Sequence, residues 1–190
     1  MGTQKTNIRG EIEVICGSMF SGKTKLLIKK IREAKNKNLV VSVFKPKIDT
    51  RYNESKIVSH EKNEINAIPI KNASDIIKLS KSSNLIAIDE VQFFDDKIIE
   101  TCKKLSQHNK HVILAGLDMD YLGNPFGPMP KLIDLANNVI SLNAICDICN
   151  QKAYHTYRKS KSTKTIMLGE KKEYLALCRQ CFNEKTKKNG

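Results

Sequence analysis

The stretch GSMFSGKT, residues 17–24, holds two glycines separated by four residues and ends in Lys-Thr. Loops that surround phosphate groups use this spacing, because it lets successive backbone N–H groups and the start of the following helix face the anion. The β-branched run EIEVIC at 11–16 predicts a strand, and apolar residues at helical spacing predict a helix over 23–37. Strand, glycine loop and helix in this order predict a phosphate-binding loop. Its members are Gly17, Ser18, Met19, Phe20, Ser21, Gly22, Lys23 and Thr24.

A pair of acidic residues, Asp89 and Glu90, follows the apolar run LIAI at 85–88. In a parallel sheet, ligands bind beyond the carboxyl ends of the strands, so this pair should meet the phosphate loop. Lys23 is expected to reach the β- and γ-phosphates, and the Thr24 hydroxyl and Asp89 are expected to hold Mg²⁺. Glu90 could then activate water, as in an ATPase, or a substrate hydroxyl, as in a kinase. Residue chemistry alone leaves both open.

Further apolar runs alternate with helical segments along the chain. Strands are expected at 39–44, 85–88, 111–116 and 139–144, helices at 74–82 (with Ser74 as the cap) and 95–109, and a loop or hairpin at 49–66. This alternation predicts an α/β fold, a parallel sheet of the P-loop NTPase type flanked by helices.

Four of the six cysteines form two C-x-x-C pairs, Cys146 with Cys149 and Cys178 with Cys181. Two such pairs can surround one tetrahedral Zn²⁺, and a site of four thiolates has no open position, so the metal would be structural. Unrelated buried thiols or a redox pair are the alternatives. Because the composition also changes after residue 144, we expect a boundary near residue 142, with a nucleotide-binding domain at 1–142 and a small zinc-binding domain at 143–190.

The chain has 190 residues and a formal net charge of +13. Its basic residues are spread along the chain, and aromatic residues do not alternate with the basic clusters as they do in platforms for single-stranded nucleic acid. No stretch approaches the ~20 apolar residues of a membrane helix, and the first 14 residues have no apolar signal core. We therefore expect a cytoplasmic protein with reduced cysteines that binds neither nucleic acid nor membrane.

Several side chains after the predicted strands are expected near the ligand edge. Phe93, Tyr121 and Phe126 could stack on a flat base, whereas core packing is the expected role of Phe94. The polar cluster DTRY at 49–52 also follows a strand, and its arginine could contact phosphate or simply be exposed.

Five motifs occur together in a fixed order: GSMFSGKT at 17–24, KPKIDTRY at 45–52, AIDEVQFF at 87–94, GLDMDYLGNPFGPMP at 116–130 and the two C-x-x-C pairs. Over about residues 10–182, this set resembles the thymidine kinases of the cellular and bacterial type, which contain zinc. The resemblance implies transfer of the γ-phosphate of ATP to the 5′-hydroxyl of thymidine, giving thymidine monophosphate and ADP. It also implies a homotetramer and feedback inhibition by thymidine triphosphate.

The resemblance also assigns roles to individual residues. It makes Glu90 the general base for the 5′-hydroxyl and Asp89 the magnesium ligand, and it places Asp49, Arg51 and Gln92 with the phosphate loop at the nucleotide. Residues 143–190 would form a lasso that closes over the nucleoside and reads thymine largely through backbone groups. The implied thymidine contacts are Met19, Phe93, Leu117, Tyr121, Phe126, Thr156, Thr165, Ile166, Met167, Leu168, Gly169 and Tyr174.

Two other function classes compete with this interpretation. A nucleic-acid-dependent ATPase with a zinc ribbon would use the same loop, cysteines and positive charge, although one small domain leaves little room for a surface that tracks a strand. A non-catalytic nucleotide-binding zinc module is the third class, and the presence of Glu90 directly after Asp89 argues against it.

Overall fold

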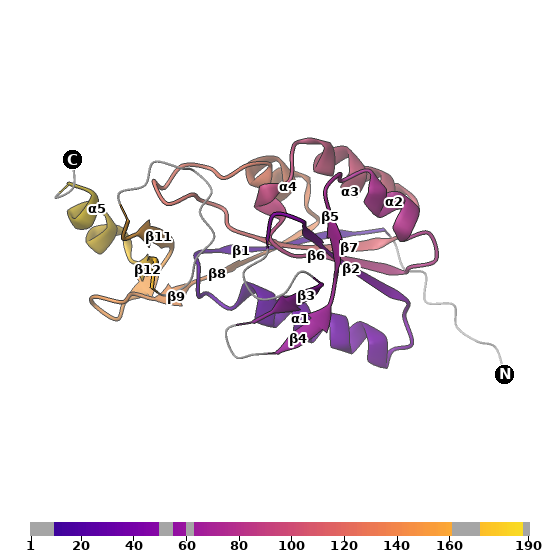
Figure 1. The fold of residues 1–190 in the computed structure, drawn as a ribbon, viewed down its shortest axis with the longest axis horizontal. Coiled ribbons are helices and arrows are strands. Elements are labelled where there is room, and N and C mark those ends of the chain that lie inside the picture. The colour runs from indigo at the N-terminus through magenta and orange to yellow at the C-terminus, as the bar shows by residue number, and fades with distance from the viewer. Residues whose placement is uncertain (1–9, 50–54, 60–62, 161–171, 188–190) are drawn as a thin grey trace.

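A six-stranded sheet forms the centre of the molecule (Figure 1). The structure is a computed structural model, and it describes residues 10–49, 55–59, 63–160 and 172–187. All neighbouring strands of the sheet run parallel, which confirms the predicted fold class. From edge to edge the strands are β5 (Ile68–Ile70), β2 (Val41–Pro46), β6 (Leu85–Ile88), β7 (His111–Gly116), β1 (Ile12–Gly17) and β8 (Asn138–Leu142).

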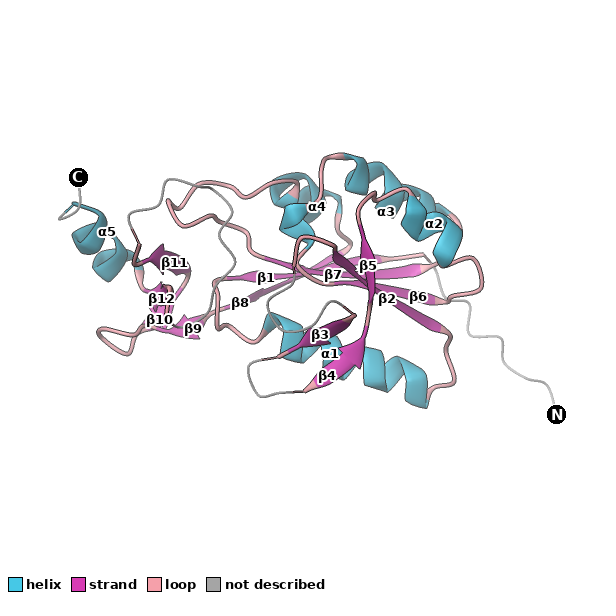
Figure 2. Ribbon diagram, in the orientation of Figure 1, coloured by secondary structure: helices cyan, strands magenta, loops and turns pink. Residues whose placement is uncertain are grey.

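Helices cover both faces of this sheet. Successive side chains of a strand point to opposite faces, so each strand can contribute apolar residues to both layers of helices. In β1, Val14 belongs to the hydrophobic cluster under α2 (Asp75–Leu79), α3 (Lys97–Gln107) and α4 (Met129–Leu135). The next residue, Ile15, belongs to the cluster under α1 (Lys23–Asn36). Figure 2 shows α2, α3 and α4 on one side of the sheet and α1 on the other. The sheet is thus buried on both faces, as a parallel sheet must be.

Helix α1 matches the predicted helix over 23–37 and has a well-defined end. Leu27, Ile28 and Ile31 bury one face of it against the sheet. Asn38 takes a left-handed φ of 58°, and the N–H of Leu39 bonds back to the carbonyl of Ala34 at 3.1 Å. This is a Schellman ending, in which asparagine replaces the usual glycine.

Between β2 and β6, the structure confirms a hairpin and adds a strand that the sequence pattern does not predict. Within the predicted loop or hairpin at 49–66, β3 (Lys56–Val58) and β4 (Glu64–Asn66) pair as an antiparallel hairpin. The strand β5 that follows is not among the predicted strands, because Pro69 interrupts its pattern. A proline is tolerated there since β5 is an edge strand, where one N–H need not bond.

Other boundaries also need correction. The helix predicted over 74–82 ends at Leu79, and the Ser74 hydroxyl makes no capping hydrogen bond. The strand predicted over 139–144 divides in two, because β8 follows β1 only as far as the phosphate loop and Ala144 begins a strand of another sheet. Helix α4 is not among the predicted elements.

The C-terminal part has its own small hydrophobic cluster, which includes Ala153, Leu177 and Phe182. Two antiparallel pairs surround this cluster, and a helix ends the described chain. They are β9 (Ala144–Ile145) with β10 (Lys152–Ala153), β11 (His155–Arg158) with β12 (Tyr174–Leu177), and α5 (Arg179–Lys187). Phe20 of the phosphate loop packs against the cluster, so this part lies beside the loop. Within the described ranges, no helix has the length and apolar character that a membrane crossing requires.

Candidate functional site

The phosphate loop lies between β1 and α1, as its spacing predicts. Gly17 has a φ of 140°, and a Cβ at this position would lie 2.1 Å from the carbonyl oxygen of Leu142. Gly22, with a φ of 89°, turns the chain into the first residue of α1. Both glycines are therefore required by the backbone path itself, because other residues adopt these conformations at a cost.

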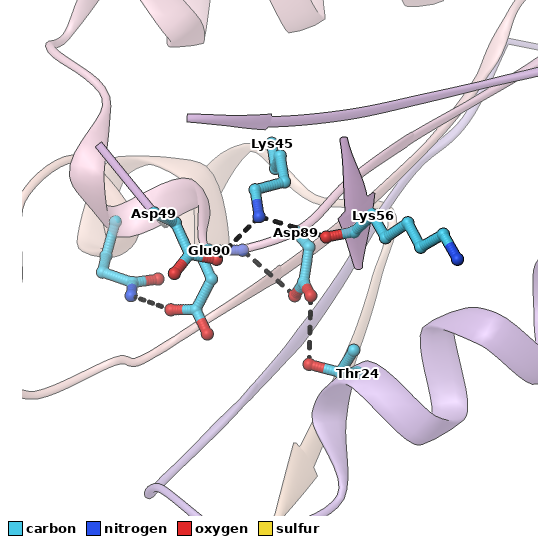
Figure 3. Close-up of polar contacts among 7 residues, drawn as sticks. Thr24, Lys45, Asp49, Lys56, Asp89 and Glu90 are labelled. Carbon is cyan, nitrogen blue, oxygen red and sulfur yellow. Dashed lines mark hydrogen bonds and ion pairs between the residues drawn. The ribbon is translucent and has the colours of Figure 1, made fainter. Parts of the chain in front are cut away.

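The two residues that end the motif point into the site. Lys23 is buried, and its Nζ donates to the carbonyl of Ser18 at 2.7 Å, so the ammonium group lies across the loop. The Thr24 hydroxyl donates to Asp89 Oδ2 at 3.0 Å (Figure 3). Two oxygen ligands about 2.1 Å from Mg²⁺ on adjacent octahedral positions are about 3.0 Å apart. The separation of the Thr24 and Asp89 oxygens is therefore compatible with a shared magnesium ion, once the hydroxyl proton turns away from the carboxylate.

Glu90 follows β6 in a strained conformation. Its φ of 51° and ψ of 40° are left-handed, which costs a residue other than glycine about 1–3 kcal/mol. Its N–H donates to Asp89 Oδ1 at 3.0 Å, and the 3-10 helix Val91–Phe93 begins directly afterwards. Such strain is common at catalytic positions, where it directs a side chain that regular structure would point elsewhere.

Gln92 links this carboxylate to a neighbouring strand end. Its Nε2 donates to Glu90 Oε2 at 2.5 Å, and its Oε1 accepts from the N–H of Leu117 at 3.1 Å. The side chain is buried, and a Cβ on Gly116 would lie 2.8 Å from Oε1. Gln92 thus orients Glu90 in this structure, and its expected contact with nucleotide stays a prediction.

One pocket brings together most of the predicted nucleotide residues. Its described lining comprises Met19, Phe20, Gly22, Lys23, Thr24, Lys25, Asp49, Lys56, Ile57, Val58, Ser59, Asp89, Glu90 and Leu117. The residues from β3 are not among the predicted site residues, because the polar segment that contains them has no clear periodicity. Arg51 lies outside the described residues.

The expected base-pocket residues divide into two groups. Met19 and Leu117 line the pocket, and the Met19 N–H donates to Thr156 Oγ1 at 3.0 Å. Phe93 and Phe126 contact each other edge to face, with ring centroids 5.7 Å apart, outside the described pocket lining. Thr165, Ile166, Met167, Leu168 and Gly169 lie outside the described residues.

Tyr121 and Tyr174 both lie near Arg158 of β11. The Arg158 guanidinium carbon is 3.3 Å from the centroid of the Tyr121 ring, and Arg158 pairs with Tyr174 across the two strands. The guanidinium covers one face of the Tyr121 ring in a cation–π contact. Sequence reasoning does not find Arg158, because one more arginine in a basic segment has no distinguishing signal.

The four cysteines of the two C-x-x-C pairs gather at one point. Their Sγ atoms all lie within 4.8 Å of one another, and Cys149 Sγ is 3.5 Å from Cys178 Sγ. Zinc–sulfur bonds of about 2.3 Å give tetrahedral edges of about 3.8 Å, so the cluster could form a zinc site. Burial opposes ionisation of the Cys146 thiol, but backbone hydrogen bonds from Cys178 and Cys149 lower its pKa to about 6. Burial and hydrogen bonds to the neighbouring thiols raise the pKa of Cys181, so the four thiols do not ionise alike. Metal binding requires thiolates.

The other two cysteines are buried in the sheet core. Cys16 and Cys102 belong to the hydrophobic cluster under α2, α3 and α4. Burial raises the pKa of the Cys102 thiol to about 12 and, together with the charge of Asp118, raises that of Cys16. Both thiols therefore act as packing groups.

Comparison with known proteins agrees with this geometry. Residues 10–182 match the family model described as thymidine kinase. The thymidine kinase of Bacteroides thetaiotaomicron is 48% identical over 179 residues, which span 94% of this chain and 90% of that protein. The thymidine kinase of Porphyromonas gingivalis is 45% identical over 176 residues (93% and 86%), and that of Rhodothermus sp. is 43% identical over 173 residues (91% and 81%).

A solved structure, the Legionella pneumophila ATPase DotB, aligns with 67% of this chain and 34% of its own. Its TM-score of 0.43 and 21% identity are too low to bear on the function. The family match and the identities of 43–48% over most of the chain are decisive instead. The chain belongs to the thymidine kinase family and is therefore a nucleotide-binding phosphotransferase.

Proposed function

We propose that this protein transfers the γ-phosphate of ATP to the 5′-hydroxyl of thymidine, giving thymidine monophosphate and ADP. The observation that carries the proposal is the position of Glu90. Its backbone is strained, the Gln92 amide holds its carboxylate, and Glu90 lines the same pocket as Thr24 and Asp89. A carboxylate at this point can accept a proton from a hydroxyl group that approaches the terminal phosphate.

In the proposed reaction, the chain acts mainly by positioning and by charge. The loop N–H groups and Lys23 bind the β- and γ-phosphates, and Thr24 with Asp89 would hold Mg²⁺. The bound magnesium ion would neutralise charge on the phosphate oxygens. Glu90 accepts the proton of the 5′-hydroxyl. At the same time the 5′-oxygen bonds to the γ-phosphorus, and the bond between that phosphorus and the ADP oxygen breaks. Phosphoryl transfer needs little more than this, provided that water is excluded.

The thymine methyl group is proposed to lie near Met19, Leu117 and Thr156. The hydrogen bond from the Met19 N–H to the Thr156 hydroxyl supports this location, because it brings the phosphate loop and the C-terminal part together there. A single methyl group in an apolar pocket contributes about 1–3 kcal/mol. Deoxyuridine should therefore remain a detectable but poorer substrate.

The deciding assay follows labelled thymidine with ATP and Mg²⁺, with deoxyuridine, uridine and deoxycytidine measured in parallel. We expect thymidine to have the highest kcat/KM, and deoxyuridine to follow at about 5- to 150-fold lower. ATP consumption that single-stranded DNA stimulates and thymidine does not would contradict the proposal. Equal rates on thymidine and deoxyuridine would contradict only the methyl pocket.

We further propose that residues 1–142 form the kinase domain and that 143–190 form a zinc-binding lid. The separate hydrophobic cluster of the C-terminal part supports this division. The hydrogen bonds from Ser18 Oγ to the Ala153 carbonyl and from Met19 to Thr156 support a lid that closes directly on the phosphate loop. Phe93, Tyr121, Phe126, Tyr174 and residues 165–169 would complete the nucleoside site.

Three properties of the assembled enzyme are proposed from family membership. They are a homotetramer, inhibition by thymidine triphosphate and a cytoplasmic location. Light scattering after size-exclusion chromatography tests the first, and inhibition competitive with ATP and thymidine tests the second. Cell fractionation tests the third.

A further inference from the structure

A fully buried lysine lies behind the nucleotide pocket. Lys45, near the end of β2, is only 1% exposed, although it is among the largest side chains of the core. Lysine is almost never fully buried unless its charge is paired, because an ammonium group loses its hydration on burial. Its surroundings must therefore compensate the charge.

The compensating groups come from two separate segments. Lys45 Nζ lies 3.5 Å from Asp49 Oδ2 and donates to the carbonyl oxygen of Lys56 at 3.1 Å (Figure 3). Asp49 belongs to the segment that follows β2, and Lys56 begins β3. One ammonium group thus joins the chain before and after residues 50–54.

The strand directs Lys45 toward the hairpin side of the sheet. In β2, Phe44 belongs to the cluster under α2, α3 and α4, and Val43 belongs to the opposite cluster, which contains Ile57 of β3. Since alternate residues of a strand share a face, Lys45 lies on the same face as Val43. Its long side chain can therefore reach β3 from within the protein.

Both partners of Lys45 line the pocket, and Lys45 is not part of the described lining. Asp49, Asp89 and Glu90 place three carboxyl groups in this one pocket. Carboxylates that share a site repel one another unless positive charge offsets them. Lys23, Lys25 and Lys56 line the pocket as well, and Lys45 adds a further positive charge that is not part of the lining.

We propose that Lys45 is a positioning residue of the kinase reaction, which acts by holding Asp49 and the start of β3 against the phosphate pocket. The proposal rests on the proposed function and adds a residue to its site. Stability alone does not account for Lys45, because replacing a buried ion pair with apolar groups is often neutral or stabilising. A role in holding Asp49 in place does account for a lysine at position 45. Misplacing a group in a reactive site by about 1 Å can lower the rate about 100-fold.

The test compares Lys45→Met, Asp49→Asn and the double variant, with Lys47→Met as the matched control. Lys47 lies two residues further along the chain and is exposed. We expect Lys45→Met to lower kcat/KM for MgATP about 100-fold, while the KM for thymidine changes by about threefold or less. The double variant should be no worse than the more impaired single variant, because both remove the same arrangement. Lys47→Met should match the parent.

Two further variants keep the test decisive. Lys45→Arg keeps the charge and should recover about tenfold of the loss. Lys45→Gln can still donate to the Lys56 carbonyl but lacks the charge, so it decides the matter if Lys45→Met does not fold. A loss of about tenfold in kcat/KM for Lys45→Gln supports the proposal. Additive losses in the double variant, or a lower melting temperature with unchanged kcat/KM, overturn it.

Binding of Mg·ADP by calorimetry separates this proposal from the proposed function, since it needs no acceptor. If the parent protein did not phosphorylate thymidine, the proposed function would fail, and Lys45 could still be tested. About tenfold weaker binding in Lys45→Met than in the parent supports the positioning role, and equal affinity in both overturns it.

Discussion

At the phosphate loop, the functional side chains extend from a six-stranded sheet with a large hydrophobic cluster on each face. At the four cysteines, the side chains come from segments that follow short strands and from α5, around one small cluster to which Cys146 and Cys181 themselves belong. The first site can keep its geometry without a ligand. The second has only this small cluster as its core, and small units of this kind are often stabilised by a metal.

This difference indicates how the two regions divide the work. The sheet fixes Thr24, Asp89 and Glu90, so phosphate chemistry depends on a rigid frame. The C-terminal part contacts the loop through Ser18 and Met19, so the proposed enclosure of the nucleoside would depend on a part that metal would stabilise. Changes at Thr24, Asp89 or Glu90 should therefore alter the chemistry with little effect on folding, and changes at the cysteines should lower activity through their effect on folding.

The largest effect is expected for Glu90→Gln. The amide keeps the size of the side chain but cannot accept the proton, and general-base catalysis contributes about 10²- to 10⁴-fold. We expect kcat to fall about 1000-fold in the thymidine assay, with the melting temperature close to that of the parent. Glu33→Gln, on the exposed side of α1, is the control and should keep full activity. Near-parental phosphorylation by Glu90→Gln would remove Glu90 from the mechanism.

Cys149→Ser should have the next largest effect and should act through folding. Losing one of four thiolates weakens metal binding, so we expect zinc content to fall and thymidine phosphorylation to drop about 100-fold. Mg·ADP binding should persist, because the phosphate loop belongs to the sheet.

Emission spectroscopy of purified protein measures the zinc, and calorimetry measures the binding. Ile148→Ala, an exposed residue between two of the cysteines, should retain metal. Unchanged zinc and stability in Cys149→Ser would refute a structural metal site.

Gln92→Leu tests how strictly the sheet must hold Glu90. The change removes the hydrogen bonds to Glu90 and to the N–H of Leu117 while nearly conserving volume. We expect kcat to fall about tenfold, since Glu90 remains but loses its orientation, and KM for ATP to change little. Gln107→Leu, at the exposed end of α3, serves as the control. A kcat equal to that of the parent would mean that the strained backbone alone positions Glu90.

The smallest effect concerns the cysteines that are not in the cluster. With a pKa of about 12, the Cys102 thiol is ionised to only about 10⁻⁴ at pH 8, and alkylation requires the thiolate. Because burial raises this pKa, the thiol stays protonated through neutral pH and ionises only as the pH approaches 12. Mass spectrometry after iodoacetamide treatment with a zinc chelator should find Cys146, whose thiol has a lowered pKa, and the exposed Cys149 modified before Cys16 and Cys102. Early modification of Cys102 would show that the sheet core opens as easily as the C-terminal part.

Local patterns predict the parts of this protein that depend on neighbouring residues. The spacing of Gly17 and Gly22, the strand before them and the helix after them predict the phosphate loop, and the two C-x-x-C pairs predict the metal cluster. The sequence pattern does not predict the edge strand β5 because a proline interrupts it. It does not predict helix α4 because its apolar segment is too short to show a helical period. Whether such segments become regular structure depends on their neighbours in the sheet.

The sequence by itself determined which groups are expected to carry the function, because a phosphate loop, a carboxylate pair and four thiols are recognisable from residue type and spacing. Only the tertiary structure decided how those groups are held. Three contacts show this: the Gln92 amide between Glu90 and Leu117, the Lys45 ammonium between Asp49 and β3, and the Arg158 guanidinium over Tyr121. They join residues that are distant along the chain or that point in directions that spacing does not reveal. Such contacts exist only after the chain has folded and placed these segments together, so no local pattern contains them.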